Sequence, residues 1–429
     1  MQECFTRPIR DTILSLLLPG IWALSCQNIG CEHTPPHTAH PTPLTPPTGR
    51  VELVESFPSE TTLDHAAVPD APDVWRAMID KAHHTIDLAH FYASEAETDA
   101  QRATSKLEPV VRALEAAMKR GVKVRFLADA LFAKQYPLTL DRLAASGAQV
   151  RKIDVQKLSG GVLHAKYFVV DGEDAFLGSQ NFDWRALDHI FEMGVHVHDA
   201  RFGGALGDVF ETDWALAGGA PRETRVATHP RATIETPAGR VSLVASPKGW
   251  LPHEEDWDLP RLVGTIDATK RELHVEVLLY KTKSRDGSPF HDLDDALRRA
   301  AARGVKVSLL VADWSTKPKS DSLAALASLA SLPNVTIRVI AIPKHSSGDI
   351  PFARLAHAKF MIADRSVAWV GTSNWEGDYF TASRNVGVIV EGGTLPATLD
   401  DVFVANWGSS YASPVAAAAP PSSNDPAPR

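Results

Sequence analysis

One short pattern of polar residues occurs twice in this sequence, in the same register, and it constrains the fold more than any other feature. The first copy runs from His164 to Asp171 and the second from His357 to Asp364. In both copies a lysine follows the histidine by two residues and the aspartate follows it by seven. A glycine, a hydroxyl residue and an asparagine then lie 14, 15 and 17 residues after each histidine: Gly178, Ser179 and Asn181 in the first copy, Gly371, Thr372 and Asn374 in the second. The chain is therefore expected to be a duplicated fold.

The spacing within each copy predicts a strand whose polar side chains share one face. His164 alternates with Lys166, and His357 with Lys359, so each pair projects from the same side. The apolar residues that follow indicate strands buried on both faces. One copy supplies an imidazole, an ammonium group and neutral donors. A single copy would be more typical of a solvent-facing strand, but two copies that face each other provide a nucleophile and an acid, which favours one catalytic site between the halves.

The rest of the chain repeats the same order of elements around these motifs. Arg120–Val124 and Arg303–Val307 are identical in sequence, and each follows a segment with apolar residues at helical spacing. The alternation of strands and helices predicts an α/β fold with a mainly parallel sheet in each half. We expect half 1 over residues 51–219, a linker over 220–240, half 2 over 241–412 and a disordered tail over 413–429.

The first 50 residues predict export rather than a folded element. Residues 1–31 contain a short apolar run after two arginines, as in a signal peptide. The segment that ends at Cys26 resembles a bacterial lipobox, in which the cysteine is lipidated and tethers the protein to a membrane that faces the periplasm or the cell exterior. A simple cleaved signal or a misassigned start codon is the alternative. Residues 32–50 are rich in proline and threonine and indicate an extended linker.

Composition excludes several classes of protein. The net charge is −8, so an extended face that coats nucleic acid is disfavoured, whereas a local cationic pocket for one phosphate or one chain end is compatible. The three cysteines all lie within the first 31 residues, so the body of the chain has neither a disulfide framework nor a cysteine-based zinc site. No helical histidine pair typical of a metalloenzyme is found, and no cofactor or metal is expected.

The double motif resembles the phospholipase D superfamily, whose hallmark is His-x-Lys-x4-Asp followed by Gly-Ser-x-Asn. The segments 155–164, 178–185, 350–354 and 371–380 are most similar to the branch of phospholipase D3/D4-type 5′ exonucleases. The second copy departs from the hallmark at Thr372, which keeps the hydroxyl. This resemblance implies two α/β/α halves related by a pseudo-twofold axis, one shared active site, and metal-free chemistry through a phosphohistidine.

The residue types also suggest individual roles. The lysines would hold phosphoryl oxygens, the asparagines would add amide donors, and Ser179 and Thr372 would support substrate binding. Asp171 and Asp364 are expected to be structural. Glu192 lies 28 residues after His164, where the second copy has the neutral Asn385, and a carboxylate on an imidazole fixes its tautomer. On that argument His164 is the nucleophile and His357 the acid. The alternative for Glu192 is a solvent-facing strand residue.

Three functions compete at this stage. A single-stranded nucleic acid 5′ exonuclease is favoured by the branch that the chain resembles. A phospholipase D or phosphatidyl transferase acting on glycerophospholipids fits a membrane tether at Cys26. A non-catalytic binding protein is disfavoured because both motifs are intact. The motif recognises the phosphodiester and not the groups that flank it, so the sequence leaves the first two functions open.

Overall fold

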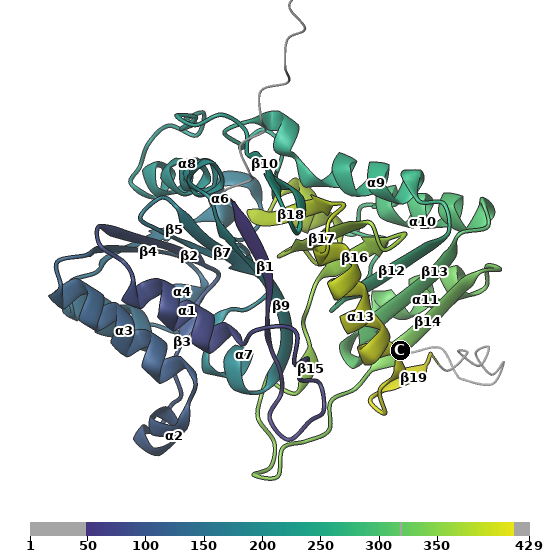
Figure 1. Cartoon of the computed structure of the whole chain (residues 1–429), viewed down its shortest axis with the longest axis horizontal. Coiled ribbons are helices and arrows are strands. Elements are labelled where there is room, and N and C mark those ends of the chain that lie inside the picture. Colours follow the sequence, from purple (N-terminus) through teal and green to yellow (C-terminus); the bar gives the residue numbers. More distant parts are fainter. Residues whose placement is uncertain (1–48, 318–319, 416–429) are drawn as a thin grey trace, which may run out of the picture. The chain divides into compact units, whose positions relative to one another are not determined.

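The computed structural model describes residues 49–317 and 320–415, which form two large sheets with the same core strand order and one small two-stranded sheet (Figure 1). The predicted export signal, Cys26 and nearly all of the predicted linker over 32–50 lie outside the described residues. Among the described helices, none is long and apolar enough to cross a membrane.

The sheet of half 1 has seven strands in one hydrogen-bonded path, and a short strand from half 2 joins it. In spatial order the path consists of β1 (Arg50–Ser56), β9 (Ile190–His198), β7 (Asp174–Gly178), β6 (Lys166–Val170), β2 (Thr85–His90), β4 (Lys123–Asp129) and β5 (Gln149–Ile153). The joining strand is β15 (Leu355–Ala356), which pairs with β9.

The sheet of half 2 repeats this order and adds one strand at each edge. Its path consists of β10 (Thr233–Thr236), β11 (Gly239–Ser246), β18 (Asn385–Glu391), β17 (Val367–Gly371), β16 (Phe360–Ala363), β12 (Glu272–Val277), β13 (Lys306–Ala312), β14 (Val335–Ile340) and β19 (Ala412–Pro414). The seven strands from β11 to β14 correspond one by one to the path in half 1. The predicted duplication and the α/β fold class are confirmed.

The prediction of a mainly parallel sheet was wrong. In half 1 only β2, β4 and β5 pair in parallel along the path, and in half 2 only β12, β13 and β14 do so. Helices connect these strands. The motif strands instead form hairpins, in which β6 pairs antiparallel with β7 and β7 with β9. Tight turns join only antiparallel neighbours, so the Asp-Gly turn after the motif already required this geometry.

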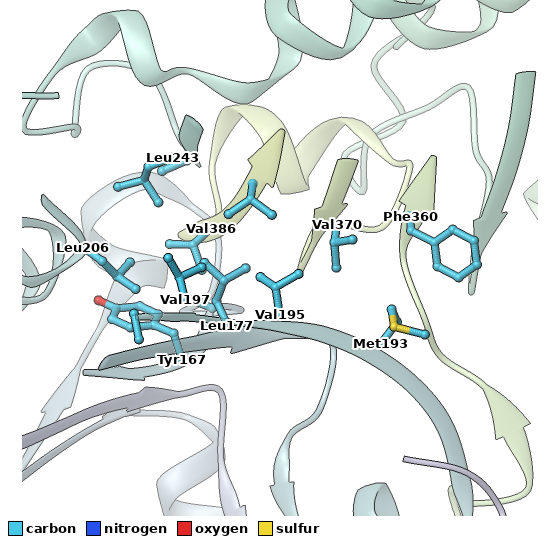
Figure 2. Close-up of a cluster of buried hydrophobic side chains, with 14 of the residues drawn as sticks. Tyr167, Leu177, Met193, Val195, Val197, Leu206, Leu243, Phe360, Val370 and Val386 are labelled. Carbon is cyan, nitrogen blue, oxygen red and sulfur yellow. The ribbon is translucent and has the colours of Figure 1, made fainter. Parts of the chain in front are cut away.

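Helices cover the outer faces of both sheets, and a shared core joins the inner faces. The outer helices are α1 (Ala71–Asp80), α3 (Leu107–Lys119) and α5 (Leu138–Ala145) in half 1, and α9 (Asp258–Ala268), α10 (Asp292–Ala302) and α11 (Asp321–Ala330) in half 2. Helices α8 (Ala200–Ala217) and α13 (Leu395–Gly408) contribute to the shared core. Figure 2 shows Leu177 and Val195 from half 1 packed near Val370 and Val386 from half 2. The two halves therefore depend on each other for burial of their apolar faces.

Two of the predicted boundaries need correction. The predicted linker over 220–240 contains β10, which pairs antiparallel with β11 and extends the sheet of half 2. Residues 413 and 414, predicted to begin a disordered tail, belong to β19, which pairs antiparallel with β14. Both strands lie at sheet edges, where a short segment can satisfy its backbone hydrogen bonds without an amphipathic pattern of its own.

Candidate active site

Each motif histidine lies two or three residues before a central strand, and its backbone N–H is hydrogen-bonded to the opposite half of the molecule. The His164 backbone N–H donates to the carbonyl oxygen of Arg384 at 2.9 Å, and the His357 N–H donates to that of Phe191 at 2.8 Å. Both imidazoles, together with Asn181, line one cavity of about 270 Å³. The structure therefore brings the two copies of the motif together at a single site, which the sequence predicted.

The side chains that hold the imidazoles cross between the halves. Glu192 on β9 accepts a hydrogen bond from Nδ1 of His357, with its two oxygens at 2.9 and 2.8 Å. Nδ1 of His164 lies 3.1 Å from Oδ1 of Asn385 on β18. The expected contact between Glu192 and His164 is therefore wrong, and so is the alternative of a solvent-facing Glu192, because this side chain is fully buried. The reason given for His164 as the nucleophile no longer applies.

The hydroxyl of Thr372 also differs from its predicted role. It donates to Oδ1 of Asn385 at 2.8 Å, so its only proton is engaged in positioning the amide that holds His164. Ser179 occupies the equivalent position in half 1, where its hydroxyl donates to the carbonyl oxygen of Met193 at 3.2 Å and accepts from the Met193 N–H at 3.0 Å. Both residues were predicted to bind substrate, but their donors are used to order the strands that carry Glu192 and Asn385.

The motif aspartates have the structural role that was predicted. Asp171 accepts hydrogen bonds from three successive backbone N–H groups, those of His83, His84 and Thr85, at 2.7 to 2.8 Å. Asp364 does the same with the N–H groups of residues 270–272. Both aspartates have positive φ angles of 52°, which places them at the tight turn after the motif strand. Each carboxylate thus ties this turn to the start of the neighbouring strand.

The two motif lysines form a buried positive centre. Both are fully buried, and each donates to the carbonyl oxygen of the histidine in its own motif. Burial lowers the pKa of Lys359 to about 7, although Glu192 opposes this shift. Burial and the charge of Lys359 lower the pKa of Lys166 well below its usual value. Burial disfavours both ammonium charges, and an anionic phosphodiester bound beside the two lysines would stabilise them.

The two motif histidines and Glu192 also have pKa values shifted by their surroundings. Burial, followed by the charges of the two lysines, lowers the pKa of both His164 and His357 well below the usual value for an imidazole. Burial raises the pKa of Glu192 to about 8, against the opposing effect of Lys359. Perturbed groups of this kind that converge on one cavity are typical of catalytic sites. Within residues 49–317 and 320–415, no group of three or more His, Cys, Asp or Glu side chains is arranged to hold a metal ion.

The two motif asparagines are buried at the site and have unused hydrogen-bonding capacity. Within the described part of the chain, Oδ1 of Asn181 and Oδ1 of Asn374 have no hydrogen-bond partner. Of the two, Asn181 lines the cavity that contains the histidines. The unpaired atoms are acceptor oxygens, so they leave the amide donors expected from the sequence a prediction.

Sequence reasoning did not place three residues against His164, namely Asn385, Phe91 and Tyr379, the last of which it had noted only as an aromatic residue that could pack in the core or stack on a base. Asn385 was noted only as the neutral counterpart of Glu192, although its matching offset was a sufficient signal that it also holds an imidazole. The ring of Tyr379 packs 4.7 Å from the imidazole of His164, and the ring of Phe91 packs 5.1 Å from it. Nζ of Lys166 lies 5.0 Å from the centre of the Phe91 ring. The spacing of aromatic residues along the sequence does not distinguish those that contact an active-site histidine from those that pack in the core.

Comparisons with known proteins agree with this geometry. A family model described as "Cardiolipin synthase, PLD-like domain" matches residues 75–214 and 262–407, one range in each half. The "5'-3' exonuclease PLD3" of Bos taurus is 33% identical over 442 aligned residues, which cover 95% of this chain and 90% of that protein. The "5'-3' exonuclease PLD4" of Mus musculus is 30% identical over 397 residues, covering 84% and 78% respectively.

A solved structure supports the fold. The phosphatidylserine synthase of Haemophilus influenzae Rd KW20 superimposes with a TM-score of 0.57 at 12% sequence identity, over 80% of this chain and 85% of that one. At this level of identity the similarity concerns the fold alone. With the matched domain in both halves and the identity to PLD3 and PLD4 over most of the chain, this protein belongs to the phospholipase D superfamily, in the branch of PLD3 and PLD4.

Proposed function

We propose that this protein hydrolyses phosphodiesters through a phosphohistidine and acts as a 5′ exonuclease on single-stranded nucleic acid. The observation that carries the proposal is the pair of buried imidazoles that line one cavity, each with Nδ1 engaged by a residue of the opposite half. Because Nδ1 is engaged in both rings, Nε2 is the nitrogen left for chemistry. Two such nitrogens beside two buried ammonium groups are what an in-line displacement at phosphorus requires.

The partners of the two histidines suggest different protonation states. Oδ1 of Asn385 accepts hydrogen bonds, while its amide nitrogen donates to the carbonyl oxygen of Tyr379 at 2.7 Å, so Nδ1 of His164 must carry the proton. Neutral His164 then has its lone pair on Nε2, as a nucleophile needs. Glu192 is bonded to Nδ1 of His357, so the pair can hold a proton between them, and an ionised partner favours the imidazolium form that an acid needs, although burial opposes both charges. We therefore keep His164 as nucleophile and His357 as acid, on a different argument from that offered by the sequence.

The reaction then has two steps. Nε2 of His164 attacks phosphorus while His357 transfers a proton to the leaving oxygen, so that the shortened strand departs with a hydroxyl group and the terminal nucleotide stays bound to His164 through its phosphoryl group. Neutral His357 next accepts a proton from water, whose oxygen attacks phosphorus, breaks the bond to Nε2 and releases the nucleotide with its phosphate. Lys166 and Lys359 stabilise the charge on the phosphoryl oxygens in both transition states. No step requires a metal ion.

Nucleic acid is the favoured substrate because the relatives named above are exonucleases and because the net charge of −8 fits recognition of a chain end. The test is an assay of the purified protein in EDTA, with a 5′-hydroxyl single-stranded oligonucleotide and labelled phosphatidylcholine side by side. Stepwise loss of nucleotides from the 5′ end supports the proposal. Cleavage of phosphatidylcholine alone would assign a phospholipase D, and activity that EDTA abolishes and a divalent ion restores would contradict the two-histidine mechanism.

The roles of the two histidines can be separated with a good leaving group. His357→Ala should reduce oligonucleotide cleavage by roughly 10²- to 10⁴-fold, the usual contribution of a general acid. It should reduce cleavage of methyl p-nitrophenyl phosphate much less, because p-nitrophenolate leaves without a proton. His164→Ala should abolish both reactions, and mass spectrometry after acid-free quenching should detect the phosphorylated imidazole on His164. An adduct on His357 would reverse the assignment.

We also propose that the chain is exported and tethered to a membrane through a lipid on Cys26, which the lipobox-like segment supports. In a suitable bacterial host, Cys26→Ala should move the protein from the membrane fraction to the soluble fraction without loss of phosphodiesterase activity. Equal membrane fractions for the two forms would contradict the tether.

A further inference from the structure

The cavity that contains the histidines continues into a second, larger cavity on the side of half 1. The inner cavity of about 270 Å³ and the outer cavity of about 460 Å³ share three lining residues, Gln135, Tyr136 and Arg185. Residues 349–351 of half 2 form part of the outer lining. The two cavities are therefore neighbours, and we refer to them together as the groove.

A continuous series of aromatic rings follows this groove from the catalytic histidine outward. The ring of Phe91, 5.1 Å from His164, lies 4.0 Å from that of Phe132, which in turn lies 6.1 Å from Tyr92. Tyr92 stacks on Tyr136 at 5.0 Å, and Tyr136 belongs to both cavities. We call these four residues the aromatic wall. At the equivalent positions of Phe91 and Tyr92, half 2 has Leu278 and Leu279, so the wall is a feature of one half only.

The other half contributes an unusually exposed aromatic side chain to the inner cavity. Phe352 lines this cavity, yet 65% of its surface is exposed. Its φ angle is +60°, a conformation that is unfavourable for a bulky residue. Arg354, two residues later, holds the segment in place through hydrogen bonds to the carbonyl oxygens of Pro343 and Ser59, both at 2.7 Å. Both the exposed apolar surface of Phe352 and its positive φ angle are unfavourable, and the fold nevertheless keeps this phenyl ring at the inner cavity.

The charges of the two cavities differ. Lys166 and Lys359 lie at the inner end, where the phosphodiester reacts. Of the described residues that line the outer cavity, Arg185 is the one cation, and it is already paired with Asp183 at 3.0 Å. Three carboxylates also line this cavity, those of Glu95, Glu97 and Asp349. A phosphate is therefore attracted to the inner end, whereas the outer cavity suits a flat and uncharged group.

We propose that the groove binds two successive nucleobases of a single strand, which deepens the nuclease function proposed above and rests on it. The base nearest the reacting phosphate contacts Phe352 on one side and Phe91 and Phe132 on the other. The next base lies in the outer cavity against Tyr136. Any of the bases can stack on an aromatic side chain, because each base has a π-face. Such stacking is the usual way in which proteins bind single strands without sequence preference.

The experiment compares variants on substrates with and without bases. Phe352→Ala and Tyr136→Ala should each raise KM for a 5′-hydroxyl oligothymidylate by roughly 5- to 100-fold, the effect expected for the loss of one stacked base. Cleavage of methyl p-nitrophenyl phosphate, which has no base, should change much less, so the ratio of the two kcat/KM values falls. Phe352→Trp keeps a flat ring and should retain the wild-type ratio. Val404→Ala, which shortens an apolar side chain that is 52% exposed on α13, is the matched control and should leave both reactions unchanged.

Abasic oligonucleotides give an independent measurement. Replacement of the bases at the first two positions by abasic residues should raise KM for the wild type and should have little further effect on Phe352→Ala. If the wild type cleaves both oligonucleotides equally and neither alanine variant alters KM, the base-binding groove is wrong while the nuclease function stands. If no oligonucleotide is cleaved but phosphatidylcholine is, the proposed function itself fails, and the groove fails with it.

Discussion

At the scale of single residues, the site depends on one chemical difference between two equivalent positions. Glu192 and Asn385 occupy the same place in β9 and β18, and each holds the imidazole of the opposite half. A carboxylate stabilises an imidazolium ion, whereas an amide oxygen only orients the ring. The duplicated fold therefore becomes chemically asymmetric through this pair of residues.

Glu192→Gln should weaken His357 as an acid. Without the carboxylate the pKa of His357 falls, so the high-pH limb of the kcat/KM profile for the oligonucleotide should move to lower pH. The rate at neutral pH should fall toward the roughly 10²- to 10⁴-fold limit set by complete loss of the acid. Cleavage of methyl p-nitrophenyl phosphate should be affected less. An equal loss on both substrates with an unchanged pH profile would mean that Glu192 has only a structural role.

At the scale of elements, the turn after each motif strand is held by a carboxylate that binds three backbone N–H groups. Although burial acts to raise it, the pKa of Asp171 is lowered from 3.8 by the hydrogen bonds from Thr85, His83 and His84. The stabilisation from such a depressed pKa is fully present above the unfolded value and is lost as the pH falls through the folded value.

Asp171→Asn should therefore destabilise the protein by about 1–3 kcal/mol at neutral pH, because an amide accepts these hydrogen bonds less well and brings an additional donor. The difference in free energy of unfolding between the wild type and the variant should shrink as the pH falls below about 3.8. Urea unfolding at a series of pH values measures this difference in the free energy of unfolding. Asp364→Asn is the matched variant in half 2, and a difference that does not change with pH would contradict the role of the charge.

Helix α8 of half 1 is joined to half 2 by a fully buried ion pair. Arg384 donates to Asp213 on α8 at 2.8 Å, and also to the carbonyl oxygens of Ser246 and Trp250. Arg384 also precedes Asn385, and its own carbonyl oxygen accepts from the His164 N–H. The ion pair therefore lies next to the residues that position His164.

Arg384→Met should cost about 3–5 kcal/mol of stability, because it leaves the carboxylate of Asp213 buried without a partner. The double variant Asp213→Leu/Arg384→Met should recover part of this loss, since the unpaired charge is removed. Chemical unfolding of the three proteins gives the comparison. A double variant no more stable than Arg384→Met alone would show that the unpaired carboxylate of Asp213 is not the cause of the loss.

At the scale of the whole molecule, the two halves share both a core and an active site. The inner faces of the two sheets pack against each other, and Figure 2 shows side chains from both halves in one cluster. An isolated half would expose its part of this core and would contain one histidine without the side chain that holds it. The catalytic unit should therefore be the complete chain.

Separate expression of residues 49–219 and 220–415 should give poorly soluble products without phosphodiesterase activity, whereas co-expression should restore some activity. Solubility and hydrolysis of methyl p-nitrophenyl phosphate are the measurements. Turnover by one half alone would refute the shared site, unless size-exclusion chromatography shows that this half forms a dimer that reconstitutes two motifs.

The repeated offsets in the sequence were sufficient to identify His164, Lys166, His357 and Lys359 and to predict two equivalent α/β halves, because strand alternation and helix spacing are local properties. Tertiary structure alone decided which carboxylate holds which imidazole. Near a pseudo-twofold axis, a residue at a given offset can contact the histidine of either half, and an offset counted along one half does not distinguish them. Glu192 reaches His357 for that reason, and the aromatic wall beside His164 likewise forms only when distant segments pack together.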